Sequence, residues 1–374
     1  MKSLRILKKV TVSIFSLGAV LTLAAYIFLQ QPIFGQEPAG ARLARIEAAS
    51  NFVDGKFENS IVTPQLAEGY SMLDILHKTL FKKSNRVRPA GIIPSIKTNL
   101  KNLRPDQDVL VWFGHSSYFM QIDGKRILVD PIFSGNASPI PGTVKAFEGT
   151  DIYTVDELPY IDYLFISHDH YDHLDKETVV KLRNKTGKVI CGLGVGAHFE
   201  RWGYDQAVII EKNWQDSIVL DKGFTAFVTP ARHFSGRGLT RNNTLWCSFL
   251  LKTPSMKIYM GGDSGYGPHF AEIGRRFGPI DLAFLENGQY DEAWPYIHTA
   301  PKEVLQAAMD LNAKKVFPVH SAKFALANHA WDEPLSKITA LNTKTAIPLI
   351  TPVIGQLVYL KMDQQFSNWW TGVQ

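Results

Sequence analysis

The amino-acid sequence predicts an α/β protein in which stacked β-sheets are covered by helices. From residue 109 onward, many short apolar runs alternate with fewer helical patterns, which is typical of this class. The chain has 374 residues, of which 45% are hydrophobic and 20% charged, so it can bury a large core and is not expected to be disordered. These observations predict a catalytic domain of α/β architecture over residues 105–374.

Apolar runs bounded by turn-forming residues define the expected strands of this domain. We expect strands over residues 109–113, 118–122, 126–129, 163–166, 188–191, 224–229, 245–251, 257–260, 282–285 and 315–319. Helical spacing of apolar residues predicts helices over residues 176–184 and 302–310. No low-complexity tract or short-period repeat interrupts the pattern, which favours one continuous domain.

The N-terminus predicts a membrane-spanning segment. Four basic residues within the first nine positions precede an uncharged apolar run over residues 10–29. At about 1.5 Å per residue, this run is long enough to cross a hydrocarbon core of roughly 30 Å. No convincing small-x-small site follows, so residues 1–31 are interpreted as a signal anchor, with a cleaved signal peptide as the alternative. The basic flank would stay in the cytoplasm, which would place the catalytic domain on the outer, periplasmic face of the inner membrane.

Residues 32–104 are rich in turn-forming residues and are expected to wrap around the catalytic domain. Within them, basic and apolar side chains alternate from Leu76 to Arg88. Beside a membrane anchor, this stretch could rest on an anionic lipid surface. A solvated helix face is the alternative interpretation, and the sequence leaves both open.

The composition bears on the expected binding partners and on the state of the two cysteines. The net charge of +5 is modest, and no long basic tract with interleaved aromatic residues occurs, so we expect no nucleic-acid partner. Cys191 and Cys247 lie in apolar surroundings and are interpreted as core residues rather than as metal ligands or a disulfide. The oligomeric state is not predicted by any of these features.

The stretch from Ser167 to Asp175 is the strongest indication of function. It contains three His and three Asp within nine residues, whereas the whole chain has 11 His. It comes directly after an apolar run, so the end of one strand would deliver several side chains to one point. Histidine nitrogen and aspartate oxygen together suit Zn²⁺, with Mn or Fe as alternatives. The stretch therefore predicts a metal site.

Three more candidate ligands, His233, Asp263 and His320, each follow another predicted strand. Gly261 and Gly262 precede Asp263 and would let the backbone approach a metal closely. A single histidine at a strand end is usually a hydrogen-bonded structural residue. Four strand ends that carry such residues in one chain favour a shared metal site at one edge of the sheets.

The His-x-His-x-Asp-His motif at residues 168–173 resembles the signature of the metallo-β-lactamase superfamily, and the downstream candidates follow in that family's order. Within the superfamily, the chain is most similar to N-acyl-phosphatidylethanolamine phospholipase D and its bacterial relatives. The similarity spans roughly residues 105–337. It is carried by residues 112–116, 128–134, 166–175, 262–266, 272–279 and 324–328.

This resemblance implies a four-layer αβ/βα sandwich with a dinuclear zinc site at one edge. By matching position, one metal ion would be held by His168, His170 and His233, the other by Asp172, His173 and His320, and Asp263 would bridge both. A hydroxide between two such cations is a nucleophile at neutral pH, so Asp172 and Asp263 are expected to serve catalysis. Asp130 and Asp175 are expected to orient ligands, with a turn or cap role as the alternative.

Four residues are expected near the substrate. His298 matches a family histidine that contacts the phosphate or the leaving group, although Ile297 stands where the family has glutamine. Asn287 and Tyr290 belong to a segment that departs from the phospholipase pattern. His115, at a strand end, is expected to line the site rather than to bind metal.

These features predict a membrane-anchored, zinc-dependent phosphodiesterase of phospholipase D type, acting on N-acyl phosphatidylethanolamine or a related phosphodiester. The segment Glu286-Asn287-Gly288 is closer to relatives that resemble sugar-phosphate lactonases. A lactonase or esterase that uses the same dinuclear site is therefore the alternative. A non-enzymatic anchored binding protein is the third hypothesis, and it is disfavoured because every ligand position is filled.

Overall fold

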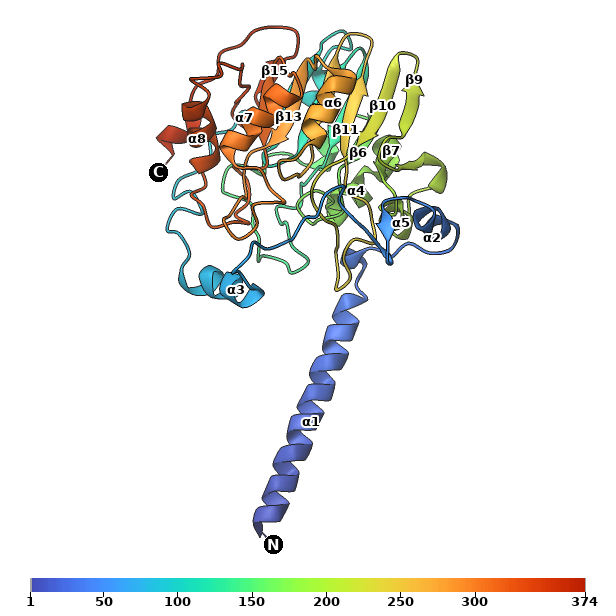
Figure 1. Cartoon of the computed structure of the whole chain (residues 1–374), viewed down its shortest axis with the longest axis vertical. Coiled ribbons are helices and arrows are strands. Elements are labelled where there is room, and N and C mark those ends of the chain that lie inside the picture. The colour runs from blue at the N-terminus through green and yellow to red at the C-terminus, as the bar shows by residue number, and fades with distance from the viewer. Residues whose placement is uncertain (1, 374) are drawn as a thin grey trace.

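The computed structural model describes residues 2–373 and is built around two facing β-sheets with helices on their outer faces (Figure 1). In sheet order, the seven-stranded sheet contains β15 (Leu357–Tyr359), β3 (Val109–Trp112), β4 (Tyr118–Ile122), β5 (Lys125–Val129), β6 (Ile161–Ile166), β7 (Thr186–Gly192) and β8 (Ile209–Lys212). The six-stranded sheet contains β14 (Val316–Val319), β13 (Leu282–Glu286), β12 (Lys257–Met260), β11 (Ser248–Lys252), β10 (Phe224–Thr229) and β9 (Ser217–Asp221). A separate hairpin pairs β1 (Phe52–Val53) with β2 (Lys56–Phe57).

Helices cover the outer face of each sheet. The seven-stranded sheet packs against α4 (Lys176–Leu182) and α5 (Gly196–Arg201), and the six-stranded sheet against α6 (His269–Phe277), α7 (Pro301–Asp310) and α8 (Glu333–Leu341). The remaining helices are α1 (Lys2–Leu29), α2 (Gly40–Glu47) and α3 (Met72–Phe81). The predicted four-layer αβ/βα sandwich is therefore confirmed.

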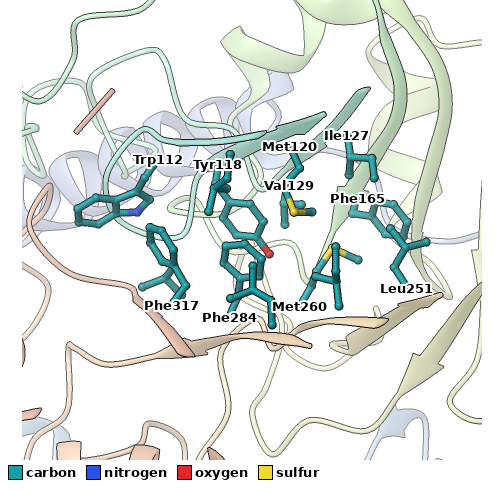
Figure 2. Close-up of a cluster of buried hydrophobic side chains, with 14 of the residues drawn as sticks. Trp112, Tyr118, Met120, Ile127, Val129, Phe165, Leu251, Met260, Phe284 and Phe317 are labelled. Atoms are coloured by element: carbon teal, nitrogen blue, oxygen red, sulfur yellow. The ribbon is translucent and has the colours of Figure 1, made fainter. Parts of the chain in front are cut away.

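The largest hydrophobic core lies between the two sheets (Figure 2). Tyr118 of β4 stacks on Phe284 of β13 with ring centroids 3.9 Å apart, and both rings are buried. Side chains alternate between faces along each strand, so Ile127 and Val129 enter this core while Leu128 packs beneath the outer helices. This alternation is why the strands have apolar residues at nearly every position.

The predicted strands over residues 118–122, 224–229 and 257–260 coincide with β4, β10 and β12. The strand predicted over residues 245–251 instead begins at Ser248, and the helix predicted over residues 176–184 ends at Leu182 before a 3-10 turn. Strands β8, β9 and β15 of the two large sheets were not predicted, nor was the short β1–β2 hairpin. Cys191 and Cys247 are buried free thiols, as expected.

Strand direction brings the chemically active side chains to one edge of the sandwich. In the seven-stranded sheet, β5 and β6 are parallel, and β3 runs the same way because it reaches β5 through antiparallel β4. In the other sheet, β12, β13 and β14 are parallel, and β10 shares their direction through antiparallel β11. The carboxyl ends of these strands carry every predicted metal ligand.

Residues 32–104 run across the catalytic domain and make specific contacts with it. The Arg42 guanidinium pairs with Glu200 at 2.7 Å and with Glu211 at 2.8 Å. The Trp202 indole donates to the carbonyl of Pro32 at 2.7 Å, close to where α1 ends. These contacts fix the base of α1 against the domain, and α1 itself projects away from it (Figure 1).

Candidate metal centre

The loop after β6 is held in place by two aspartates. The Asp130 carboxylate accepts hydrogen bonds from the Ser167 amide at 2.9 Å and the Ser167 hydroxyl at 2.6 Å, and it lies 2.8 Å from His173 Nδ1. Asp175 caps α4 by accepting from the Glu177 amide at 3.1 Å. Asp130 thus contacts a predicted ligand directly. For Asp175 the structure shows the cap role that was the alternative, because its described hydrogen bonds go to helix α4 and to the amide of Ser134.

The first ligand cluster contains His168, His170 and His233, whose ring nitrogens lie within 4.8 Å of one another. His170 Nδ1 lies 2.9 Å from His168 Nε2 and 3.2 Å from His233 Nε2. Burial lowers the pKa of all three rings, to about 4 for His170. Neutral imidazoles with converging nitrogens are the form that binds a metal ion.

The second cluster contains Asp172, His173 and His320, with His115 beside them, and its ligand atoms also lie within 4.8 Å of one another. Burial opposes protonation of His173, but the nearby carboxylates of Asp263 and Asp172 raise its pKa well above the usual value. Burial lowers the pKa of His320 well below its usual value. The cluster thus combines one carboxylate with several imidazole nitrogens, a donor set that suits zinc.

Asp263, at the end of β12, lies between the two clusters. Its Oδ1 is 3.1 Å from His173 Nε2 and 3.1 Å from His320 Nδ1, while its Oδ2 is 3.9 Å from His168 Nε2 and 3.8 Å from His233 Nε2. Burial raises the pKa of the Asp263 carboxyl to about 7. This placement supports the bridging role that the resemblance implies.

The donor atoms fit a bound cation because several are buried without a hydrogen-bond partner. Among the described residues these include His173 Nε2, His320 Nε2 and Asp263 Oδ1. His173 Nε2 and Asp263 Oδ1 are close, but the geometry between them is not that of a hydrogen bond. An unpaired buried polar atom costs about 1–3 kcal/mol, so such a concentration indicates a partner that the protein itself does not supply.

His115 does not line the substrate pocket, in contrast to the prediction. Its ring is buried behind the ligands, and its Nε2 lies 2.9 Å from Asp172 Oδ2. The backbone amide of His115 donates to the carbonyl of Ser321, and the backbone amide of His320 donates to the carbonyl of His115. His115 therefore positions Asp172 and joins the loop after β3 to the loop after β14.

Asn287 and Tyr290 also lie outside the pocket wall, so their predicted role there is wrong. The Asn287 amide is buried and donates to the carbonyl of Pro334 at 2.9 Å. The Tyr290 hydroxyl donates to Glu333 at 3.0 Å and its ring stacks on His329. Both side chains point towards α8 or the segment just before it, and away from the metal ligands. Gln289 occupies the wall instead.

His298 lies in the pocket wall, and it has a partner that the sequence did not reveal. Its Nδ1 lies 2.9 Å from Glu286 Oε2 at the end of β13, and the Thr299 amide donates to Glu286 Oε1 at 2.6 Å. Burial raises the pKa of the Glu286 carboxyl well above its usual value and lowers that of His298. A proton shared by this pair can reach the pocket through His298.

A second residue that the sequence did not reveal comes from the N-terminal extension. Asn59 Nδ2 donates to the His233 carbonyl at 2.8 Å, and Asn59 Oδ1 accepts from the His233 amide at 3.1 Å. The His233 ring is oriented in turn, because its Nδ1 lies 2.9 Å from the carbonyl of Ile297. The extension thus fixes the backbone of one predicted metal ligand.

Five of the seven predicted ligands, His170, Asp172, His233, Asp263 and His320, form the floor of a pocket of about 250 Å³. Its wall is largely apolar, with one cation, Arg241, at the rim. The apolar side chains are Leu66, Met72, Ile75, Phe234, Trp294, Ile297 and Leu326. A larger hollow lies against residues 134–152 and contains none of the predicted metal ligands, so the smaller pocket is the candidate substrate site.

The fold and the clustered ligands define a metal-dependent hydrolase, and comparisons with known proteins agree. The sequence profile of the family described as a Beta-lactamase superfamily domain matches residues 125–321. The chain is 36% identical over 358 residues to an uncharacterized protein of Mycobacterium tuberculosis strain H37Rv, covering 93% of this chain and 96% of that protein. The chain therefore belongs to the metallo-β-lactamase superfamily.

Two further proteins connect this chain to characterised relatives and to a known fold. This chain is 34% identical over 241 residues to the mitochondrial N-acyl-phosphatidylethanolamine-hydrolyzing phospholipase D of Saccharomyces cerevisiae. The matched region covers 62% of this chain and 51% of the yeast protein. The structure of Igni18, a metallo hydrolase from the archaeon Ignicoccus hospitalis, matches with a TM-score of 0.52 at 19% identity, covering 67% of this chain and 97% of that one. The second similarity shows the fold alone.

Proposed function

We propose that the protein is a membrane-anchored, zinc-dependent phosphodiesterase that hydrolyses N-acyl phosphatidylethanolamine or a related lipid phosphodiester. The observation that carries this proposal is an apolar pocket whose floor holds two ligand clusters with Asp263 between them. Such a pocket can bury acyl chains while it presents a phosphodiester to the metal ligands. The similarity to the yeast phospholipase D supports the same substrate class.

Two metal ions are proposed, one held by each cluster. His168, His170 and His233 would hold the first, Asp172, His173 and His320 the second, and Asp263 both. Zinc suits these nitrogen and oxygen donors, and Mn or Fe would accept the same set. When bound, such a pair of cations polarises phosphoryl oxygens and lowers the pKa of a water between them.

The other side chains of the pocket have separate tasks. Arg241, whose guanidinium packs over the Phe234 ring at 5.3 Å, can pair with an anionic oxygen at the rim. The neutral His298 ring can donate a proton from Nε2 to the leaving alkoxide while its Nδ1 accepts one from the Glu286 carboxyl. The apolar wall excludes water from the acyl portion of the substrate.

Helix α1 is the proposed anchor. Within it, the 26 residues Leu4–Leu29 are long and apolar enough to cross a membrane, although a signal sequence has the same character. Its side chains are exposed along most of its length, as expected for a helix that contacts lipid. The four basic residues in its first turns favour a cytoplasmic N-terminus and a catalytic domain on the outer, periplasmic face.

The substrate assay that tests this function uses the full chain in detergent. We expect zinc-restored hydrolysis of N-acyl phosphatidylethanolamine to phosphatidic acid, with weaker turnover of acyl and sugar lactones, and about two metal ions per chain by elemental analysis. A lactone hydrolysed far faster than every phosphodiester would instead establish the lactonase alternative. That alternative rests on the segment Glu286-Asn287-Gly288, which departs from the phospholipase pattern.

Glu286→Gln tests the proposed proton transfer. Glutamine keeps the size of the side chain but cannot supply an acidic proton to His298, so we expect kcat on a lipid phosphodiester to fall roughly 10- to 100-fold. Turnover of bis(p-nitrophenyl) phosphate should change little, because its leaving group needs no proton. Glu272→Gln, on the exposed side of α6, is the control.

Metal content decides between two roles for Glu286, whose carboxylate also lies within 4.8 Å of ligand atoms of Asp263, His298 and His320. Unchanged metal content with a leaving-group-dependent loss of kcat would support the proton-transfer role. Loss of one metal ion per chain, with both substrates affected equally, would make Glu286 a metal ligand instead.

A further inference from the structure

Helix α3 exposes most of its apolar side chains. Leu73 is 76% exposed, Leu76 53% and Phe81 74%. Leu73 and Leu76 are three positions apart, so they lie on the same side of the helix. A surface helix of a globular protein normally turns its apolar side towards the core. On α3 this arrangement is reversed, and an exposed apolar patch of this kind marks an interaction surface.

Another side of α3, which carries Ile75 and Lys78, is attached to the rim of the substrate pocket. Lys78 Nζ donates to both oxygens of the Asp291 carboxylate, at 3.0 and 2.9 Å. Ile75 and Met72 contribute to the pocket wall. The helix begins with a capping box between Ser71 and Asp74, which stabilises its first turn. The ion pair and the cap hold α3 with Leu73 and Leu76 pointing away from the domain.

The position of α3 relative to α1 indicates what covers this apolar surface. With α1 vertical, α3 lies at the lower edge of the domain, at the level where α1 joins it (Figure 1). A bilayer that surrounds α1 would therefore meet α3. Lys82 and Lys83 follow directly and are exposed, which suits anionic headgroups beside an apolar surface. If the partner were a protein, there would be no reason for the apolar surface of α3 to lie at the level where α1 leaves the domain.

We propose that α3 docks on the phospholipid surface as a second membrane attachment, with Leu73 and Leu76 in the acyl boundary and Lys82 and Lys83 at the headgroups. Because Met72 and Ile75 of the same helix line the pocket, this attachment holds the pocket mouth against the bilayer. A lipid could then pass from the membrane into the pocket along an apolar path. This role in substrate access rests on the proposed function, whereas the docking itself does not.

The docking is tested with the full chain in vesicles of phosphatidylcholine and phosphatidylglycerol. A fluorescent thiol probe is placed at Leu73→Cys and, as a control, at Val219→Cys; the native cysteines are buried. Val219 is a matched site because it is 77% exposed, and its strand β9 lies at the end of the domain away from α1. We expect spin-labelled lipid to quench most of the fluorescence at position 73 and little at position 219. Equal quenching at both positions would refute the proposal.

A second measurement separates docking from catalysis. The double variant Leu73→Glu/Leu76→Glu should lose most of its turnover of vesicle-embedded substrate while it hydrolyses soluble bis(p-nitrophenyl) phosphate normally. Equal turnover of the embedded substrate by this variant and by Val219→Glu would overturn the access role. If neither substrate is hydrolysed by the unmodified chain, the proposed function fails, and the quenching experiment still decides whether α3 contacts lipid.

Discussion

Asp263→Asn should reduce phosphodiester turnover roughly 100-fold or more and lower the metal content of the purified chain. Asp263 is within reach of both clusters, with Oδ1 at 3.1 Å from His173 Nε2 and Oδ2 at 3.8 Å from His233 Nε2. A neutral amide has a similar shape, but it does not supply the negative charge that offsets two cations. Loss of a ligand should cost more than the 10- to 100-fold typical of residues that only orient ligands.

The Asp263→Asn experiment combines elemental analysis, steady-state kinetics and circular dichroism on the same preparation. Asp156→Asn is a matched control, because it makes the same chemical change at an exposed position of the catalytic domain. A folded Asp263→Asn protein that keeps both metal ions and full activity would exclude the bridging role. It would also remove the main support for a dinuclear mechanism.

The clustering of the candidate ligands could be predicted because each of them follows an apolar strand in the chain. Polar residues such as His233 and His320 stand out at the ends of β10 and β14, and parallel strand direction then brings them to one edge. Glu286 satisfies the same rule at the end of β13. Its role was missed because the segment was interpreted as a departure in substrate specificity, although strand-end position alone was a sufficient signal.

Contacts between distant parts of the chain could not be predicted in this way. Asn59 bonds to the backbone of His233, and His115 contacts Asp172, across 174 and 57 positions of the sequence respectively. No local pattern marks Asn59, since an asparagine among turn-forming residues is ordinary. His115 was noticed at its strand end, but only the folded arrangement shows that Asp172 stands between it and the pocket.

The three strands that were missed in the two large sheets share a physical cause. β8 and β15 are the two edges of the seven-stranded sheet, and β9 is an edge of the other. An edge strand pairs on one side only and is less deeply buried, so it needs fewer apolar residues. β15 has three residues, and β9 alternates exposed and buried positions. The apolar runs that define central strands are therefore weak at the edges.

Asp130→Asn should both destabilise the fold and weaken metal binding. The carboxylate accepts from the amide and the hydroxyl of Ser167 and lies 2.8 Å from His173 Nδ1, all in the interior. Asparagine tolerates the positive φ of 41° at this position but has a single acceptor oxygen, so at least one buried donor loses its partner. We expect unfolding to become easier by about 2–3 kcal/mol and metal affinity to fall roughly 10- to 100-fold.

Asp123→Asn is the matched control that separates these two effects of Asp130→Asn. Asp123 also has a positive φ, 47°, and its carboxylate accepts hydrogen bonds from Thr253 and Ser255. It lies at the turn between β4 and β5, however, at the end of these strands that is far from the ligands. This variant should lose some stability and no metal affinity. If denaturant unfolding and metal titration showed the same changes in both variants, the Asp130 contact with His173 would be structural only. A selective loss of affinity in Asp130→Asn would show that this carboxylate sets the orientation and basicity of the His173 ring.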